Sequence, residues 1–148
     1  MNSKTLEEIA NLLEDDATNY TVFLESFEMS LTHPSTSAAL IKGALGEEAV
    51  LSGIEEVQGA SVWRLVEEAL LYAGDDGAGP SAAVMASEKL ASLMDTLKKK
   101  VGELARTATK IEAFGLQAGH PGYPVFWDFA LLFRTGTTAT VFIGSSSD

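Results

Sequence analysis

Histidine chemistry in this sequence could be built only on His33 or His120, the two imidazoles of the chain. His33 precedes Pro34 at the end of an expected helix, where a surface role is favoured. His120 lies in a rigid turn eight residues before Asp128, and a carboxylate can orient a histidine for acid–base catalysis. Because no serine or threonine stands at a spacing diagnostic of a triad, a structural role for His120 and Asp128 is favoured, and no catalytic residue is predicted.

Asp128 stands inside an alternating apolar run from Val125 to Arg134 that is predicted to be a strand. Both faces of this strand are largely apolar, so it should be buried on both sides. An unpaired carboxylate in such a place is very costly. We therefore expect Asp128 to be paired inside the fold, either with His120 or with backbone groups or an arginine.

Other kinds of reaction chemistry find little support. The chain has no cysteine, so it can form neither a disulfide nor a thiolate metal site, and it has no catalytic thiol. Two glycines in the 77–82 stretch have the spacing that opens a dinucleotide-binding fingerprint, but a proline intrudes and a helix precedes them. The segment Asp75-Asp76-Gly77 lacks the staggered ligands and closing glutamate of a calcium loop. No cofactor and no metal site is therefore predicted.

The net charge of the chain is −11, and the acidity belongs to its first half. Residues 1–80 carry three Lys or Arg against fifteen Asp or Glu, whereas residues 81–113 carry six against four. A negative field repels phosphate backbones and anionic lipid headgroups, so neither a nucleic-acid nor a membrane partner is expected. The one basic run, Lys98-Lys99-Lys100, is interpreted as a solvated helix face. A basic protein, by contrast, would be attracted.

Many of the acidic residues stand in adjacent pairs, which concentrate negative potential. Four of these pairs are predicted to steer a cationic protein toward the chain, and exposed aromatic residues nearby would supply the binding energy. Ordinary solubility of exposed helix faces is the alternative explanation. The predicted partner-binding residues are Glu47, Glu48, Glu55, Glu56, Glu67, Glu68, Asp75 and Asp76, with Trp63 and Tyr72 as aromatic anchors.

Helices are predicted over most of the first 114 residues. Apolar residues at helical spacing predict helices from Thr5 to about Asp16, over 20–31, over 38–45 and from Ser61 to Gly74, followed by an exposed loop at 75–80. The longest helix is predicted from 81 to about 114, where apolar residues alternate by four and three as in a heptad seam. A helix laid across the core is favoured, and a homodimer built on the seam is the alternative.

After residue 124 the apolar period changes to two. Strands are predicted over 125–134 and 138–143, with a turn at 135–137 and a polar tail at 144–148. A hairpin alone is marginally stable, so it should be covered by the helices, extended by a further strand or paired with another copy. The predicted fold is a single α+β domain over residues 1–148. It is mainly helical, with four or five helices, one of them long, and a C-terminal antiparallel hairpin packed on the helices.

These observations favour a protein-binding module that is not an enzyme. Its most concrete form is a bacterial immunity or antitoxin-type inhibitor that masks a basic toxin or nuclease. One alternative is an acidic chaperone or adaptor for a secreted substrate, and another is a small hydrolase that uses His120 and Asp128. The first residues lack the basic start and apolar run of a signal peptide, and no stretch approaches about 18 consecutive apolar residues, so cytoplasmic residence is expected.

Overall fold

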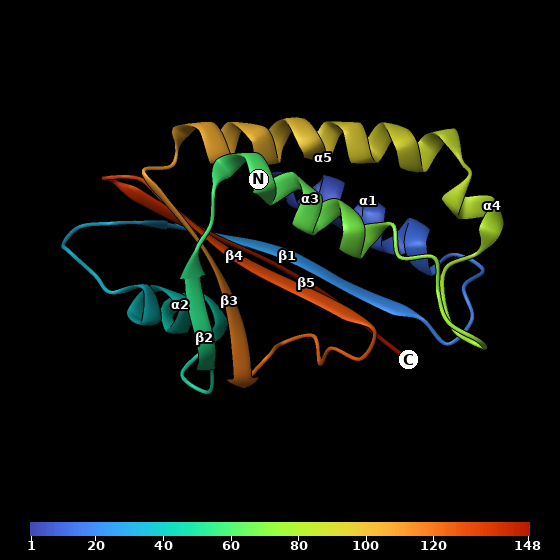
Figure 1. Ribbon diagram of the computed structural model, residues 1–148, viewed down its shortest axis with the longest axis horizontal. Coiled ribbons are helices and arrows are strands. Elements are labelled where there is room, and N and C mark those ends of the chain that lie inside the picture. The colour runs from blue at the N-terminus through green and yellow to red at the C-terminus, as the bar shows by residue number, and fades with distance from the viewer.

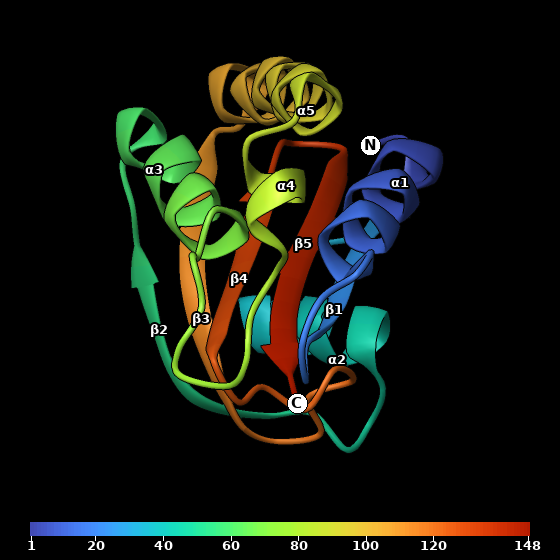
Figure 2. The same cartoon turned by 90° about the vertical axis from the view of Figure 1, so that its right-hand side faces the viewer.

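A five-stranded antiparallel sheet is the centre of the fold in the computed structural model, which describes residues 1–148 (Figure 1). The elements in chain order are α1 (Ser3–Glu14), β1 (Thr21–Ser30), α2 (Ser37–Leu45), β2 (Val50–Glu56), α3 (Gly59–Leu70), α4 (Ala82–Met85), α5 (Glu88–Thr107), β3 (Lys110–Ala118), β4 (Trp127–Arg134) and β5 (Thr138–Ser147). The strands follow the order β1-β5-β4-β3-β2, so β1 and β2 are the edges. Helices α1, α3, α4 and α5 cover one face of the sheet, and α2 lies against the other (Figure 2).

The prediction of a mainly helical fold whose only sheet is a C-terminal hairpin is wrong. The chain is 39% helix and 32% strand. The predicted hairpin exists as β4 and β5, but β5 also pairs with β1 and β4 also pairs with β3. The hairpin is therefore the middle of the sheet, and helices cover it on both faces. This position explains why both of its faces are apolar.

Two strands in the first half were not predicted. β1 stands where the sequence predicted a helix over 20–31, and its side chains alternate: Val22 and Leu24 pack into the core under the helices, whereas Phe23 and Phe27 pack on the α2 side. A strand that is apolar on both faces gives an apolar run that also fits a spacing of three and four, which explains the error. β2 was missed because nearly all of its residues are exposed, so it carries no apolar alternation.

The long helix predicted from 81 to 114 is three separate elements. Ser87 separates α4 from α5 and caps α5, because its Oγ accepts the amide hydrogen of Leu90 at 3.2 Å. After Thr107 the chain becomes extended and enters β3. Ile111 of β3 packs into the same core as α5. It therefore continued the apolar spacing of the helix without belonging to it.

Within α5 the heptad seam faces the core of its own chain, which confirms the core-spanning interpretation of this segment. The seam is consequently not available as a contact surface for a second copy. The buried seam residues are Leu90, Met94, Leu97 and Val101.

None of the helices combines the length and the apolar composition that crossing a bilayer requires.

The predicted polar tail at 144–148 is instead, up to Ser147, the second half of β5. Its backbone is hydrogen-bonded on both sides, because Ser145 lies opposite Phe23 of β1 and opposite Asp128 of β4. Ser145 and Ser146 are buried. Small side chains suit these positions, since aromatic rings from neighbouring strands occupy the space beside them: an added Cβ at Gly144 would lie 2.7 Å from the ring of Phe129.

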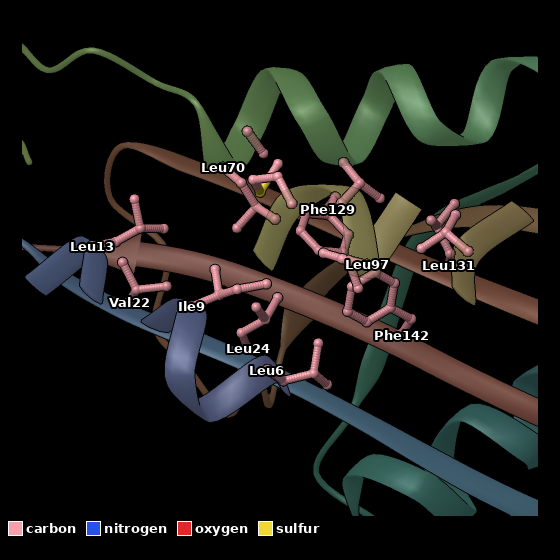
Figure 3. Packing of buried hydrophobic residues seen from close by; sticks show 14 of the residues in the cluster. Leu6, Ile9, Leu13, Val22, Leu24, Leu70, Leu97, Phe129, Leu131 and Phe142 are labelled. Atoms are coloured by element: carbon pink, nitrogen blue, oxygen red, sulfur yellow. The ribbon is translucent and has the colours of Figure 1, made fainter. Parts of the chain in front are cut away.

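The main core lies between the sheet and α1, α3 and α5, and a second apolar cluster lies between the sheet and α2. Figure 3 shows that both the helices on this face and the sheet contribute side chains to the main core. Side chains from three helices meet side chains from three strands, so each element buries one apolar face against the others. The residues labelled there are Leu6, Ile9 and Leu13 of α1, Val22 and Leu24 of β1, Leu70 of α3, Leu97 of α5, Phe129 and Leu131 of β4, and Phe142 of β5.

A buried polar network holds α2 on its face of the sheet. Glu112 of β3, only 7% exposed, accepts a hydrogen bond from Ser37 at the start of α2. Arg134 of β4 donates to the same hydroxyl at 3.2 Å and to the carbonyl of Ser35 at 2.7 Å. Lys110 lies 3.7 Å from the second oxygen of Glu112. Because a buried carboxylate needs such partners, this network fixes where α2 begins.

Candidate functional site

An open groove between α3 and α5 is the best-formed apolar cleft of the molecule. The wall on the α3 side is made by Trp63 and Glu67 together with Leu71, which directly follows the helix. These residues are four apart, so they stand on one face of the helix. The adjacent face of α3 carries Val62 and Val66, which are fully buried in the main core. The amphipathic sequence of α3 thus anchors the helix and leaves its Trp63 stripe facing outward.

The other wall comes from α5, with Met85 of α4 closing one end. Leu90 and Met94 form the floor, because they are 2% and 7% exposed and belong to the core below. Ala91 lies between them along the wall, and its small side chain leaves the groove open. The lining of α5 extends from Ser87 to Lys98, which corresponds to roughly 17 Å of helix at about 1.5 Å per residue. We call this cleft the α3–α5 groove; its lining residues are Trp63, Glu67, Leu71, Met85, Ser87, Leu90, Ala91, Met94, Asp95 and Lys98.

Charged residues lie only at the rim of the groove. Trp63 Nε1 donates to Glu67 Oε2 at 3.1 Å, which holds the indole along the wall. Asp95 is paired with the exposed Lys99 at 3.1 Å, and the exposed Lys98 also lines the groove. The Asp95 and Lys99 pair is solvated and adds little stability. Both Glu67 and Asp95 are therefore accessible to a cationic group that enters the groove.

The lining of the groove suits the binding of apolar side chains. Its volume is about 350 Å³, near the lower end of the range of about 300 to 1,000 Å³ that is typical of ligand pockets. This space accommodates a few side chains and not a whole segment of chain. Its floor and one of its ends carry methionine, whose flexible thioether adapts to the shape of an apolar group. A tryptophan at the edge of such a cleft is the residue type most often found at energetic centres of interfaces.

All eight predicted acidic partner-binding residues are exposed, but they do not gather in one place. Glu47 and Glu48 occupy the turn before β2, and Glu55 and Glu56 lie at its far end, about 20 Å away at about 3.3 Å per residue. Figure 2 shows that β2 and α3 form one side of the molecule. The remaining pairs are Glu67 and Glu68, on α3, and Asp75 and Asp76, in the exposed loop after it.

Among the predicted site residues the structure brings only Trp63 and Glu67 into the groove. Tyr72, which was predicted to be an aromatic anchor, does not line the groove. Its ring is half-buried and stacks on Tyr20 and Phe126, with centroids 6.3 and 6.0 Å apart. Burial, together with the nearby carboxylate of Asp75, raises the pKa of Tyr72 to about 12. Tyr72 therefore belongs to an aromatic cluster that joins the end of α3 to the sheet.

Asp128 is exposed and forms neither a hydrogen bond nor an ion pair, so the prediction that it is paired inside the fold is wrong. It is the second residue of β4, at the end of the sheet, where its side chain still reaches solvent although Phe129 and Ala130 beside it are buried. His120 lies near enough for the charge of Asp128 to act on it. Burial nevertheless lowers the pKa of His120, and the carboxylate only opposes this effect.

Hydrogen bonds in the corner around His120 hold a loop in place. His120 Nδ1 accepts the amide hydrogen of Gly122 at 2.9 Å, while Nε2 is buried without a partner. Ser145 is the hydroxyl in this corner, but it is fully buried and donates to the carbonyl of Gly122 at 3.1 Å. Proton transfer to an outside substrate would require these contacts to break. The geometry thus agrees with the structural role favoured for His120.

Sequence reasoning missed most of the groove. Leu90 and Met94 were recognised as apolar positions of a helix, but nothing in the linear pattern marks which flank of that helix stays open. Met85 and Leu71 lie outside the two long helices. The available signal was the pair of Trp63 and Glu67 four residues apart, which gives an outward-facing aromatic and acidic stripe on a predicted helix.

Comparison with protein-family models, with curated proteins and with solved structures finds no match to this chain.

Proposed function

We propose that this chain is a non-catalytic cytoplasmic module that binds a basic protein, and that the α3–α5 groove receives apolar side chains of that partner. The observation that carries the proposal is the groove itself, an open apolar cleft edged by Trp63, whose charged lining residues are two carboxylates, Glu67 and Asp95, and one lysine, Lys98. The most concrete form of such a module is a bacterial immunity or antitoxin-type inhibitor that masks a basic toxin or nuclease.

The shape of the groove supports an amphipathic helix as the bound element. The groove runs between two helices for about 17 Å, or roughly three helical turns. Helices that dock in such grooves insert apolar side chains spaced three or four apart and leave their own backbone outside. The cavity of about 350 Å³ has the room that this mode needs. Lysine or arginine residues flanking the inserted side chains would lie against Glu67 and Asp95.

Charge supports a basic partner and a fast encounter. The chain carries a net charge of −11, and exposed acidic pairs lie along the side formed by β2 and α3. Long-range attraction of this kind raises association rates and leaves affinity to a few buried contacts. We assign the steering to the acidic pairs and the affinity to the groove.

The two alternative functions find less support. An acidic chaperone or adaptor that dimerises through the heptad seam would need apolar side chains that α5 buries in its own core, such as Leu97 and Val101. A hydrolase that uses His120 and Asp128 would need an accessible proton acceptor, and neither residue lines the groove. A binding module remains the function that agrees best with the geometry.

A groove-filling variant tests the proposal. Ala91→Trp would fill the cleft from within the α5 wall. Its matched control is Thr96→Trp, which adds the same side chain at an exposed position of α5, outside the groove lining. The probe is an amphipathic peptide of leucine and lysine, long enough for about four helical turns. We expect Ala91→Trp to weaken binding at least about tenfold, which corresponds to about 1.4 kcal/mol, and Thr96→Trp to leave it unchanged.

A peptide of the same composition but scrambled order distinguishes groove binding from simple charge attraction. The proposal requires the ordered peptide to bind more tightly than the scrambled one, because only the ordered peptide presents an apolar stripe. Equal affinity of the two peptides, or full affinity in Ala91→Trp, would refute it. Circular dichroism of both variants checks that each is folded.

A further inference from the structure

The loop between β3 and β4 is held rigidly although it lies at the surface. Its backbone at Gly119 has φ +78° and packs against the carbonyl of Glu48 in the turn before β2. Gly122 lies so close to Phe23 of β1 that an added Cβ would be 2.7 Å from the Cβ of that residue. Gly122 is also hydrogen-bonded to His120 and Ser145 through its amide and its carbonyl. The loop therefore contacts three segments that are distant in sequence: the turn before β2, strand β1 and strand β5.

The same loop presents an aromatic side chain to solvent. Tyr123 is 79% exposed, the most exposed of the large apolar side chains, and Val125 is 47% exposed. Tyr123 has φ +41°, a left-handed backbone conformation that is unfavourable for a bulky residue. Pro121 and Pro124 on either side restrict the backbone further. A strained and immobilised backbone that points a tyrosine outward has no explanation in the packing of this chain.

Three acidic residues lie in the elements that adjoin the loop. Glu48 lies in the turn against which the loop packs, and Asp128 follows the loop at the start of β4. Glu25 lies on β1, on the same face of the sheet as Phe23, which contacts the loop. All three carboxylates are exposed, and none forms an ion pair. A cationic side chain that stacks on the tyrosine ring would therefore also find carboxylates as hydrogen-bond acceptors.

We propose that the β3–β4 loop is a preformed contact site for an arginine side chain of a partner protein, with Tyr123 as the stacking surface and Asp128 as the acceptor. Arginine is the fitting group because its planar guanidinium stacks on aromatic rings and donates hydrogen bonds in the ring plane at the same time. Rigidity favours binding, since little conformational freedom is left to lose. The site contacts β1 and β5 through Phe23 and Ser145, on the α2 side of the sheet, so it is separate from the α3–α5 groove and does not depend on it.

The test uses nuclear magnetic resonance of the full chain with a capped peptide, Gly-Arg-Gly-Arg-Gly, as the probe. The matched probe has citrulline in place of arginine, which keeps the shape and removes the charge. We expect saturable shifts in residues 119–128 with the arginine peptide and none with the citrulline peptide. Tyr123→Asn should weaken binding about fivefold, because asparagine accepts the left-handed conformation but offers no ring. Tyr123→Phe should retain it.

Three results would overturn the proposal: unchanged affinity in Tyr123→Asn, equal binding of the citrulline peptide, or shifts confined to α3 and α5. The last of these would leave the groove as a binding site while removing the loop site, so the two proposals fail separately. The spectrum of Tyr123→Asn also shows directly whether the fold and the loop are intact. Asp128→Asn provides a second variant, and it should weaken binding of the arginine peptide without shifting the resonances of the loop.

Discussion

Arg134 offers a sharp test of how α2 is held, because its contacts to α2 and the preceding loop are few and well defined. It donates two hydrogen bonds, to Ser35 at 2.7 Å and to Ser37 at 3.2 Å, and Ser37 in turn donates to the buried carboxylate of Glu112. In Arg134→Met the aliphatic packing of the side chain is kept and both hydrogen bonds are lost. Hydrogen bonds that involve a charged group contribute about 1.5 to 3 kcal/mol each. Since Arg134 is only half-buried, we expect a total loss of about 2 to 4 kcal/mol.

The assay is urea unfolding followed by circular dichroism, together with a thermal melt. With an unfolding entropy of about 2.1 cal/mol/K per residue, the 148-residue chain should lose roughly 3 °C per kcal/mol, so the melting temperature should fall by about 6 to 13 °C. Arg106→Met is the matched control, because Arg106 is exposed on α5 and forms no ion pair. A loss of less than about 0.5 kcal/mol in Arg134→Met, equal to that expected of an ordinary surface change, would refute the argument.

Three further predictions follow from single contacts. Burial lowers the pKa of His120, so the neutral histidine stabilises the fold above its unfolded pKa of about 6.5, and this contribution is lost as the pH falls below that value. His120→Asn keeps an acceptor for the amide of Gly122. It should therefore make the free energy of unfolding depend less on pH in the acid range. Burial raises the pKa of Tyr72 to about 12 and also raises the pKa of Tyr20. An absorbance titration of phenolate should therefore show two of the three tyrosines ionising late, and stability should fall as the pH rises above about 10; titration of all tyrosines near pH 10 would contradict the placement of Tyr72. Gly144→Ala should destabilise the chain by about 1 to 3 kcal/mol, because its Cβ would meet the ring of Phe129 at 2.7 Å; an unchanged denaturation midpoint would show that this part of the core is loosely packed.

The sequence predicted elements correctly where one face was clearly apolar. α1, α2 and α3 were found within a few residues of their bounds, and so were β4 and the turn at 135–137. Errors occurred where contacts between elements, and not the local apolar pattern, determine the secondary structure. β1 is apolar on both faces, so Phe23 and Leu24 together imitate a helical spacing although they point to opposite sides of the sheet. Ile111 extended the apparent heptad because a following strand entered the same core.

The candidate site was predictable only in part, for a physical reason. An acidic residue is usually exposed because its charge is costly to bury, and all eight predicted acidic positions are exposed. An aromatic residue carries no such information, since Trp63 stands at a groove and Tyr72 packs into an aromatic cluster. The strain at Tyr123 likewise cannot be predicted from the sequence, because the flanking prolines indicate a rigid turn but do not determine the sign of φ at Tyr123.

The indole resonances of the two tryptophans report directly on whether the α3–α5 groove binds a basic partner. Trp63 Nε1–H lies at the groove and bonds Glu67, whereas Trp127 Nε1–H bonds Tyr20 at 2.7 Å in the aromatic cluster away from the groove. Titration with the amphipathic leucine and lysine peptide should shift the Trp63 indole signal in a saturable way and leave that of Trp127 in place. A shift of the Trp127 signal alone, or no shift of the Trp63 signal at saturating peptide, would show that the peptide does not bind in the α3–α5 groove.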